Sequence, residues 1–235
     1  MSKRKKKNKN GFYIVILIVA LLIVFYEEIV EDTYSTETSI ASYNIDNIPD
    51  YSGYAFVYIN GNVPFFEENE KNTEEFEEYG ELDRLGRCTY AYANVSKGLM
   101  PTTKRDSIVG VRPSAWRISK YDFIDGKYLY NRCHLIGYQL TGENANEKNL
   151  ITCTRQMNTG TMLEYENKVA SYVKKTGNHV LYRVTPVFEE DNLLAKGVIM
   201  EGLSIEDDEI KFNIFVYNVQ DGVIIDYSNG DNFPE

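Results

Sequence analysis

The segment from residue 131 to residue 158 constrains the fold of this chain more than any other stretch. It opens with Asn131-Arg132-Cys133-His134, closes with the polar run 149–158, and predicts two short strands that lead into a helix. Histidine has an unperturbed pKa of about 6.5 and can take a proton from water near neutral pH. Arginine offers a fixed positive fork for a phosphate, and asparagine oxygen is a ligand that Mg²⁺ accepts. This combination favours cleavage of phosphodiesters.

The same segment, continued by residues 164–169, resembles the non-specific DNA/RNA endonucleases of the ββα-metal (His-Me finger) type. The resemblance covers roughly residues 54–226, and bacterial extracellular and DNA-entry nucleases are the most similar members. Four residues that usually read Asp-Arg-Gly-His in that family read Asn131-Arg132-Cys133-His134 here. The arginine and the histidine match, whereas the aspartate and the glycine do not. Relatives also often have glutamine where Cys153 stands.

The resemblance implies roles for four residues around the substrate. His134 is the expected general base that deprotonates the attacking water, and Arg132 is the expected contact to the substrate phosphate. Arg155 is a second, weaker candidate for phosphate binding, and Asn149 is expected to shape the substrate site through hydrogen bonds. The other histidine, His179, follows a glycine and an asparagine at a strand start and is expected to be structural.

The resemblance also implies a catalytic metal ion, Mg²⁺ with Mn²⁺ as the alternative. Asn158 matches the position whose side-chain oxygen binds the metal directly. Glu166 lies eight positions later, which in a continuous helix means about 12 Å along the axis and about 80° around it. Glu166 is therefore expected to act catalytically by holding a water of the metal rather than by direct ligation, with Glu164 as the competing choice.

The fold expected for the chain is α+β, with a mainly antiparallel sheet, an embedded ββα-metal finger and one preceding transmembrane helix. Residues 54–59 and 63–65 flank Asn60-Gly61 and predict a hairpin, while the acidic run 67–81 predicts an exposed loop or helix. Apolar residues recur with a helical period over 161–175, and Gly177 is a stop signal. Further strands are expected at 88–93, 128–136, 179–188, 193–200, 211–219 and 223–227.

The amino terminus has the pattern of a targeting segment. A basic stretch at 1–10 precedes an uninterrupted apolar run at 11–26, then a polar stalk at 27–52 and the nuclease-like domain at 53–235. The apolar run would span about 24 Å as a helix, close to a hydrocarbon core of about 30 Å. Residues 27–32 lack the small-x-small pattern of a cleavage site, so we expect a single-pass membrane anchor with the domain outside the cell. Cleavage would make the protein secreted.

Charge is distributed unevenly along the chain. The formal net charge is −10, yet residues 84–183 hold 16 Lys or Arg against 7 Asp or Glu, a net of +9. The remaining −19 is concentrated at 67–83 and 189–208, where solvated acidic surfaces are expected. The segment that holds the expected site therefore has the basic character that phosphate binding requires.

Three cysteines, Cys88, Cys133 and Cys153, permit at most one intramolecular disulfide and leave one thiol free. No pair has the Cys-x-x-Cys spacing of a zinc site. A cysteine hydrolase that uses Cys153 or Cys133 is a poor hypothesis, because Cys133 and His134 are adjacent and would point to opposite faces of a strand.

The leading hypothesis is a metal-dependent, sequence-non-specific endonuclease that acts on DNA, and on RNA as a further substrate, outside the cytoplasm. The alternative is a catalytically inactive surface nucleic-acid-binding receptor, in which Asn131 and Cys133 mark the loss of catalysis. Trp116, Tyr138 and Tyr165 are candidates for stacking on bases, although a core or surface role is the better expectation for any one of the 19 tyrosines.

Overall fold

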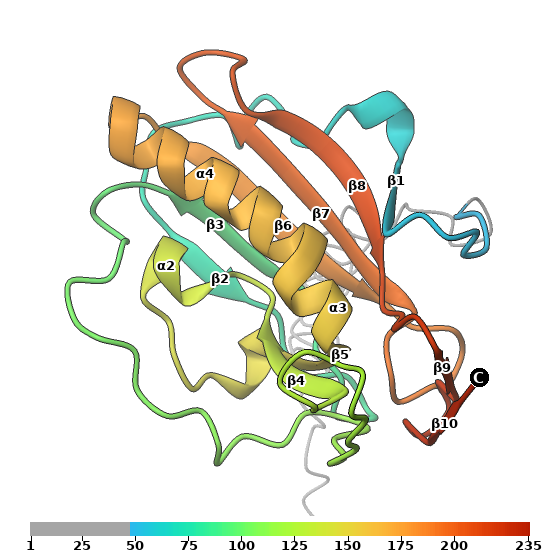
Figure 1. The fold of residues 1–235 in the computed structure, drawn as a ribbon. Helices are drawn as coiled ribbons and strands as arrows, with labels where there is room; N and C mark the ends of the chain where they lie inside the picture. The colour runs from blue at the N-terminus through green and yellow to red at the C-terminus, as the bar shows by residue number, and fades with distance from the viewer. Residues whose placement is uncertain (1–47) are drawn as a thin grey trace, which may run out of the picture. The chain divides into compact units, whose positions relative to one another are not determined.

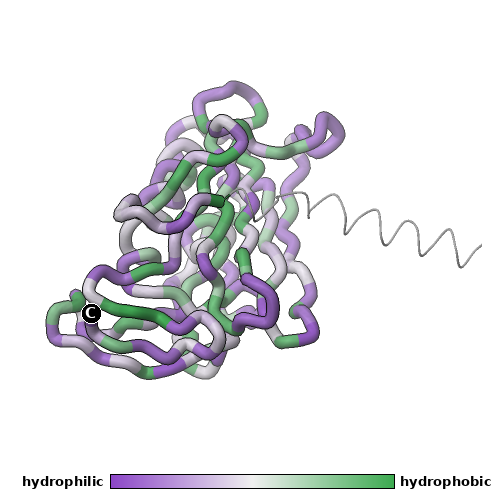
Figure 2. The backbone as a smooth tube through the Cα atoms, turned by 90° about the vertical axis from the view of Figure 1, so that its right-hand side faces the viewer, coloured by the Kyte–Doolittle hydropathy of each residue, from purple (hydrophilic) through white to green (hydrophobic). Residues whose placement is uncertain are grey.

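Six antiparallel strands form the central sheet of the computed structural model, which describes residues 48–235 (Figure 1). In spatial order they are β1 (Phe56–Tyr58), β8 (Lys211–Tyr217), β7 (Gly197–Ser204), β6 (Val180–Val187), β3 (Ala91–Val95) and β2 (Glu77–Tyr79). Hydrophobic segments run through the interior of the backbone trace, whereas many of the outer segments are hydrophilic (Figure 2). The expected α+β class with a mainly antiparallel sheet is confirmed.

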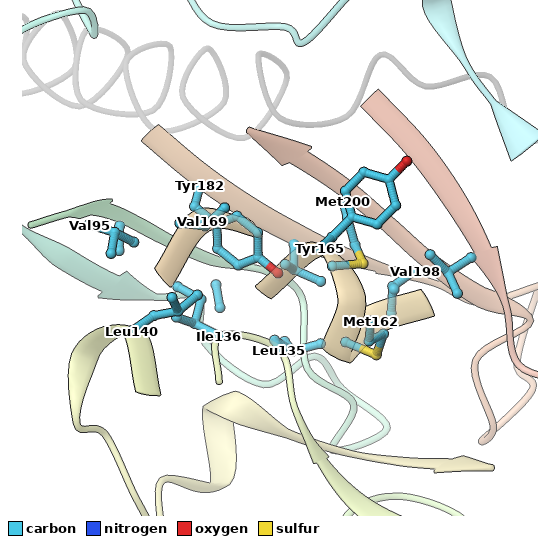
Figure 3. Packing of buried hydrophobic residues seen from close by; sticks show 14 of the residues in the cluster. Val95, Leu135, Ile136, Leu140, Met162, Tyr165, Val169, Tyr182, Val198 and Met200 are labelled. Carbon is cyan, nitrogen blue, oxygen red and sulfur yellow. The ribbon is translucent and has the colours of Figure 1, made fainter. Parts of the chain in front are cut away.

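Helix α4 (Leu163–Thr176) crosses one face of this sheet (Figure 1). Its buried side chains include Tyr165 and Val169, which lie close to Tyr182 of β6 and Met200 of β7 in the main hydrophobic core (Figure 3). The helix ends at Gly177, whose φ of +81° suits a residue without a Cβ and whose N–H donates to the carbonyl of Val173. The helix expected at 161–175 thus lies at nearly the expected place.

The ββα finger begins with a separate two-stranded sheet of β4 (Tyr130–His134) and β5 (Leu150–Thr154), with the short helix α2 (Tyr138–Thr141) between them. A hairpin of this size is marginal on its own, so its stability depends on further links. One link is the Cys133–Cys153 disulfide, whose Cα atoms lie 5.9 Å apart and which leaves Cys88 as a buried free thiol.

A second link joins the finger to the central sheet through Asn218, which directly follows β8 and is fully buried. Its Oδ1 accepts the N–H of Thr154 at 2.8 Å, and its Nδ2 donates to the carbonyls of Thr152 and Ala195. Buried amides of this kind hold backbone segments that have no ladder partner of their own. Asn218 therefore fixes the end of β5. The candidate metal ligand, Asn158, comes shortly after this end in the sequence.

The chain between β5 and α4 is not one continuous helix. Helix α3 (Arg155–Met157) passes into a π-helical turn at Asn158–Met162, where Gly160 has φ −95° and ψ −114°. Asn158 and Glu166 are therefore not joined by a continuous regular helix, and the separation of about 80° that such a helix would give does not apply.

The hairpin expected at 54–65 is also wrong. Strand β1 pairs with β8, in the register Val57 opposite Phe215, and Asn60–Asn62 forms a 3-10 turn. The backbone of Phe65 forms hydrogen bonds with side chains instead. Its N–H donates to Glu201, and its carbonyl accepts from Arg183. These two charged residues lie on β7 and β6, so the segment packs on the sheet without joining it as a strand.

Two further segments differ in detail from expectation. Part of the acidic run 67–81 forms the edge strand β2, which pairs with β3. The last expected strand is β9 (Val223–Ile225), which pairs with β10 (Asn232–Pro234) in a separate small sheet. Among residues 48–235 no helix has the length and apolar character needed to cross a membrane. The anchor expected at 11–26 lies outside the described residues.

Candidate active site

A cleft of about 870 Å³ opens beside the finger, bounded by the loop before β4, by the finger itself and by the start of α4. Five of the six residues singled out from the sequence line it, whereas Asn149 does not. The polar and charged lining residues that matter below are Arg105, Asn131, Arg132, His134, Gln139, Arg155, Asn158 and Glu166. The fold thus brings together side chains from three separate segments of the chain.

His134 ends strand β4 and is 7% exposed. Its Nε2 lies 2.7 Å from the carbonyl oxygen of Asn144, and since a carbonyl can only accept, Nε2 carries the hydrogen. Nδ1 of the neutral ring is then the basic nitrogen, and Nη2 of Arg105 lies 3.3 Å from it. Burial lowers the pKa of His134 from 6.5 to about 4, with Arg105 contributing in the same direction and the hydrogen bond to Asn144 opposing it.

Arg105 was not singled out from the sequence. It lies in the loop that precedes β4, and its side chain hydrogen-bonds His134. Within the described part of the chain no carboxylate lies within ion-pair distance of it, unlike Arg117, which pairs with Asp231, and Arg155, which pairs with Asp125. Arg105 is thus a cation in the cleft that is available to an anion.

Arg132 points its guanidinium at the loop that borders the cleft. Nε donates to the carbonyl of Val111, Nη2 donates to the carbonyl of Val109 at 2.9 Å, and the group lies 3.8 Å from the ring centroid of Trp116. Burial and the nearby Arg112 lower the pKa of Arg132. Part of this arginine is therefore committed to holding the loop, and its remaining N–H groups are left for other contacts.

Asn131 joins the two ends of the finger. Its Oδ1 accepts from Nδ2 of Asn158 at 3.3 Å and from Nη1 of Arg155 at 3.4 Å. The oxygen of Asn131 thus receives two hydrogen bonds where the family has an aspartate. Because the amide nitrogen of Asn158 is used in this contact, its Oδ1 is the atom that remains for a ligand.

Glu166 lies in the first turns of α4 and is 8% exposed at the cleft. Burial raises the pKa of its carboxyl group from 4.5 to about 8, while hydrogen bonds from the Gln139 side chain and the Gly137 backbone, together with the charge of Arg105, lower it. A buried acid that opens onto a cleft is a group whose charge a bound cation would stabilise. Glu164, the competing choice, is exposed and forms an ion pair with Lys168.

Asn149 is fully buried beneath the cleft. Its Oδ1 accepts the N–H of Ile136 at 2.9 Å, and its Nδ2 donates to the carbonyl of the same residue at 3.0 Å. Both ends of the amide are thereby used to fix the backbone two residues after His134. Its position is consistent with shaping the site and leaves it no direct path to a substrate.

The stacking candidates differ in their positions. Trp116 and Tyr138 line the cleft, and the hydroxyl of Tyr138 donates to the carbonyl of Thr103 at 3.0 Å. Tyr165 is a core residue packed against Phe212, with ring centroids 4.6 Å apart. Nδ1 of His179 lies 2.7 Å from Oε1 of Glu206, and His179 is absent from the residues that line the cleft.

The finger and the residues that it brings to the cleft place the protein among nucleases of the ββα type. Residues 68–205, more than half of the chain, match the DNA/RNA non-specific endonuclease family. The chain belongs to this family.

Solved structures agree with this fold. NucA from Streptococcus agalactiae with magnesium ion bound superimposes with a TM-score of 0.71 at 20% sequence identity, covering 81% of this chain and 93% of that one. Sda1 nuclease with bound zinc ion gives a TM-score of 0.64 at 22% identity, covering 77% of this chain and 96% of that one. At such identities the likeness concerns the fold alone.

Proposed function

We propose that the protein is a metal-dependent endonuclease that hydrolyses DNA phosphodiesters, and RNA as a further substrate, without regard to sequence, with His134 as general base. The contact that supports this most directly is the hydrogen bond from Nε2 of His134 to the carbonyl of Asn144. It leaves Nδ1 as the basic atom beside Arg105, in a cleft that the other polar groups share. A water activated there would attack the phosphorus, and Nδ1 would take its proton.

Substrate binding would tune this base. In the free protein the pKa of His134 is lowered to about 4, first by burial and then by Arg105. A phosphate bound to Arg105 would offset the positive charge of the guanidinium and raise the pKa of the imidazole. His134 would therefore become a stronger base when a phosphodiester is in place, which is when a proton must be removed.

The arginines would hold the phosphate. Arg105 forms no ion pair within residues 48–235, Arg132 keeps part of its guanidinium free, and Arg155, which also pairs with Asp125, stands beside Asn131. Contacts of this kind read the backbone of a nucleic acid and carry no information about its bases. They support cleavage that does not depend on sequence.

Asn158 and Glu166 are the residues proposed to hold a divalent cation, Mg²⁺ with Mn²⁺ as the alternative. Both line the cleft, both offer hard oxygen donors, and the amide oxygen of Asn158 is free of its neighbour Asn131. Residues 48–235 contain no cluster of three or more His, Cys, Asp or Glu that could hold a metal. A Lewis-acid role needs only one or two protein ligands. When bound, the cation would supply Lewis-acid stabilisation of charge on the phosphate and on the leaving oxygen. The magnesium of NucA and the zinc of Sda1 support a divalent ion on this fold.

The proposed location is outside the cytoplasm, with residues 11–26 as a membrane anchor. Two of the nucleases of similar fold are an "extracellular endonuclease" and an "extracellular nuclease", with TM-scores of 0.55 and 0.51. The Cys133–Cys153 disulfide also fits an oxidising compartment. The partners in this setting are DNA, RNA and the membrane.

Nicking of supercoiled plasmid by the full-length protein tests the proposal, because a closed circle offers no end to an exonuclease. We expect nicking with Mg²⁺, its loss in EDTA, and a fall of about 100-fold or more in His134→Ala. Asn158→Ala is expected to need more Mg²⁺ for its residual activity. His179→Ala is the matched control, since it removes the other histidine of the chain and leaves the cleft intact. Full activity in chelator, or in His134→Ala, would exclude the mechanism.

The inactive receptor is the second candidate, because Asn131 replaces the family's aspartate. The contacts of Asn131 speak against a lost site, since its amide oxygen still accepts from Asn158 and Arg155. DNA binding without nicking in Mg²⁺, Mn²⁺ and Ca²⁺ would favour the receptor.

A further inference from the structure

Gly137 touches the carboxyl group of Glu166 so closely that no side chain fits between them. A Cβ placed on Gly137 would lie 2.3 Å from Oε2, 2.6 Å from Cδ and 2.7 Å from Oε1 of Glu166. The backbone angles of Gly137, φ −60° and ψ 142°, are open to any residue. A larger residue here would therefore have to displace the carboxyl group, so it is space and not backbone conformation that favours glycine.

The backbone of Gly137 is fixed on both sides. Before it, the N–H and the carbonyl of Ile136 are both bound by Asn149. After it, helix α2 is anchored by the fully buried Leu140 in the main core. Gly137 therefore cannot yield easily to a larger residue, and the carboxyl group would have to move instead.

Two polar groups of this segment also favour the ionised carboxyl of Glu166. The backbone N–H of Gly137 and the side chain of Gln139 both face it and lower its pKa. Gln139 is itself held by Asn167, to whose Oδ1 it donates at 3.1 Å. The Glu166 carboxyl group is thus positioned by the lack of a side chain at Gly137 and by two nearby polar groups.

Gly137 lies three residues after His134, so the segment that positions the Glu166 carboxyl group also carries the imidazole. One short stretch, residues 134–139, thereby sets the position of the imidazole and of the carboxyl group across the same cleft. We propose that Gly137 is a positioning residue for the reaction, which places the Glu166 carboxyl where it can act on a divalent cation. This inference rests on the proposed function, in which Glu166 serves the metal.

The test compares four variants of the full-length protein, Gly137→Ala, Glu166→Asp, Glu166→Gln and the double variant Gly137→Ala/Glu166→Asp. Mn²⁺ binding in the absence of nucleic acid is measured by electron paramagnetic resonance, and kcat and KM are measured on plasmid DNA. Gly110→Ala is the matched control, because a Cβ there meets nothing within 4 Å and its backbone is not left-handed.

We expect Gly137→Ala to weaken Mn²⁺ binding and to lower kcat by about 10-fold to 100-fold with KM little changed, as expected for a residue that orients a metal group. Glu166→Asp shortens the acid by one methylene and removes the overlap. In that background the added Gly137→Ala is expected to change neither quantity by more than about twofold, so the two substitutions are non-additive.

Additive losses in the double variant would overturn the inference, as would wild-type behaviour of Gly137→Ala while Glu166→Gln is inactive. Full activity of Glu166→Gln would instead remove the proposed role of Glu166 and this inference with it. If Gly137→Ala alone does not fold, the inference requires that the double variant Gly137→Ala/Glu166→Asp folds. Failure of both to fold would show that the added Cβ meets something other than the carboxyl group, and would overturn the inference.

Discussion

Nε2 of His134 donates to the carbonyl of Asn144 at 2.7 Å, which fixes the tautomer of the one histidine in the cleft. The strand that carries His134 and the loop that carries Asn144 are separated by helix α2, so the hydrogen bond spans the finger. Its effect is to direct the basic nitrogen, Nδ1, toward Arg105. The protonation state of this ring should govern how the protein responds to pH.

We expect kcat/KM at saturating Mg²⁺ to hold from neutral pH down to about pH 5 and to fall below it, because the pKa of His134 in the free protein is lowered to about 4. The pH profile of kcat should fall at a higher pH, since bound phosphate offsets the charge of Arg105. An acid limb of kcat/KM near pH 6.5 would contradict the lowered pKa.

The same shift should appear in stability. The unfolded chain binds a proton at His134 near pH 6.5 and the folded protein only near pH 4, so the unfolded state takes up more protons between these values. The contribution of the neutral ring is complete above pH 6.5 and is lost as the pH falls to 4, by at most about 3 kcal/mol. Urea unfolding of the wild type and of His134→Leu across this range should show a larger loss in the wild type, because titrations that both proteins share, such as that of Glu166, cancel in the comparison.

Arg105→Gln is expected to raise the pKa of His134 while reducing activity by about 100-fold, because it removes both a positive neighbour and a phosphate contact. The pKa should stay below 6.5, since burial, the larger cause, is unchanged. Proton NMR of the two histidines can measure the pKa, with His179→Ala used to assign the signals. Arg84→Gln, which removes an exposed partner of Asp191, is the control for loss of one positive charge. An unchanged pKa would argue against the contact.

Asn149→Ala should destabilise the protein by about 2 to 4 kcal/mol, because the buried N–H and carbonyl of Ile136 both lose their partner. Chemical denaturation provides the measurement. Asn146→Ala is a suitable comparison, since the Asn146 side chain caps one short turn by accepting from Lys148 and should cost only about 1 kcal/mol. Equal effects of the two substitutions would show that the amide of Asn149 does not hold the finger.

Removal of the disulfide by Cys133→Ser/Cys153→Ser should cost about 3 kcal/mol, the magnitude for a loop closed over 20 residues. Dithiothreitol should lower the unfolding midpoint of the wild type and leave that of the double variant unchanged. Cys88→Ser should retain the response to reductant, because Cys88 takes no part in the crosslink. A double variant that still responds to reductant would contradict the pairing.

The finger could be predicted from the sequence because its signals are local. Strands β4 and β5 and helix α4 follow from patterns within about ten residues, and the residues that match the family lie on or beside them. The sheet order could not be predicted in the same way. Phe65 reads as a strand residue, yet its backbone bonds come from Glu201 and Arg183, 136 and 118 positions away in sequence.

The set of site residues predicted from the sequence was incomplete, because some contacts in the cleft join residues far apart in the sequence. Arg105 lies 29 positions before His134 in a loop without periodicity, so nothing in its own neighbourhood indicates the contact. The cysteine count allowed one disulfide without choosing the pair, and it is the strand register, Cys133 opposite Ile151, that brings Cys153 near. Gly137 gave no signal, because its closeness to Glu166 arises only when α2 packs against α4.

The π-helical turn at Asn158–Met162 has a consequence for how the cleft can evolve. Each residue added to or removed from a helix rotates everything beyond it by about 100°. A deletion that restored an ordinary α-helical path through Gly160 would rotate Glu166 relative to Asn158 while leaving both residues in the sequence. The number of residues between these two positions is therefore as informative as their identity, and a homologue with a different interval would need a differently wound turn to keep both at the cleft.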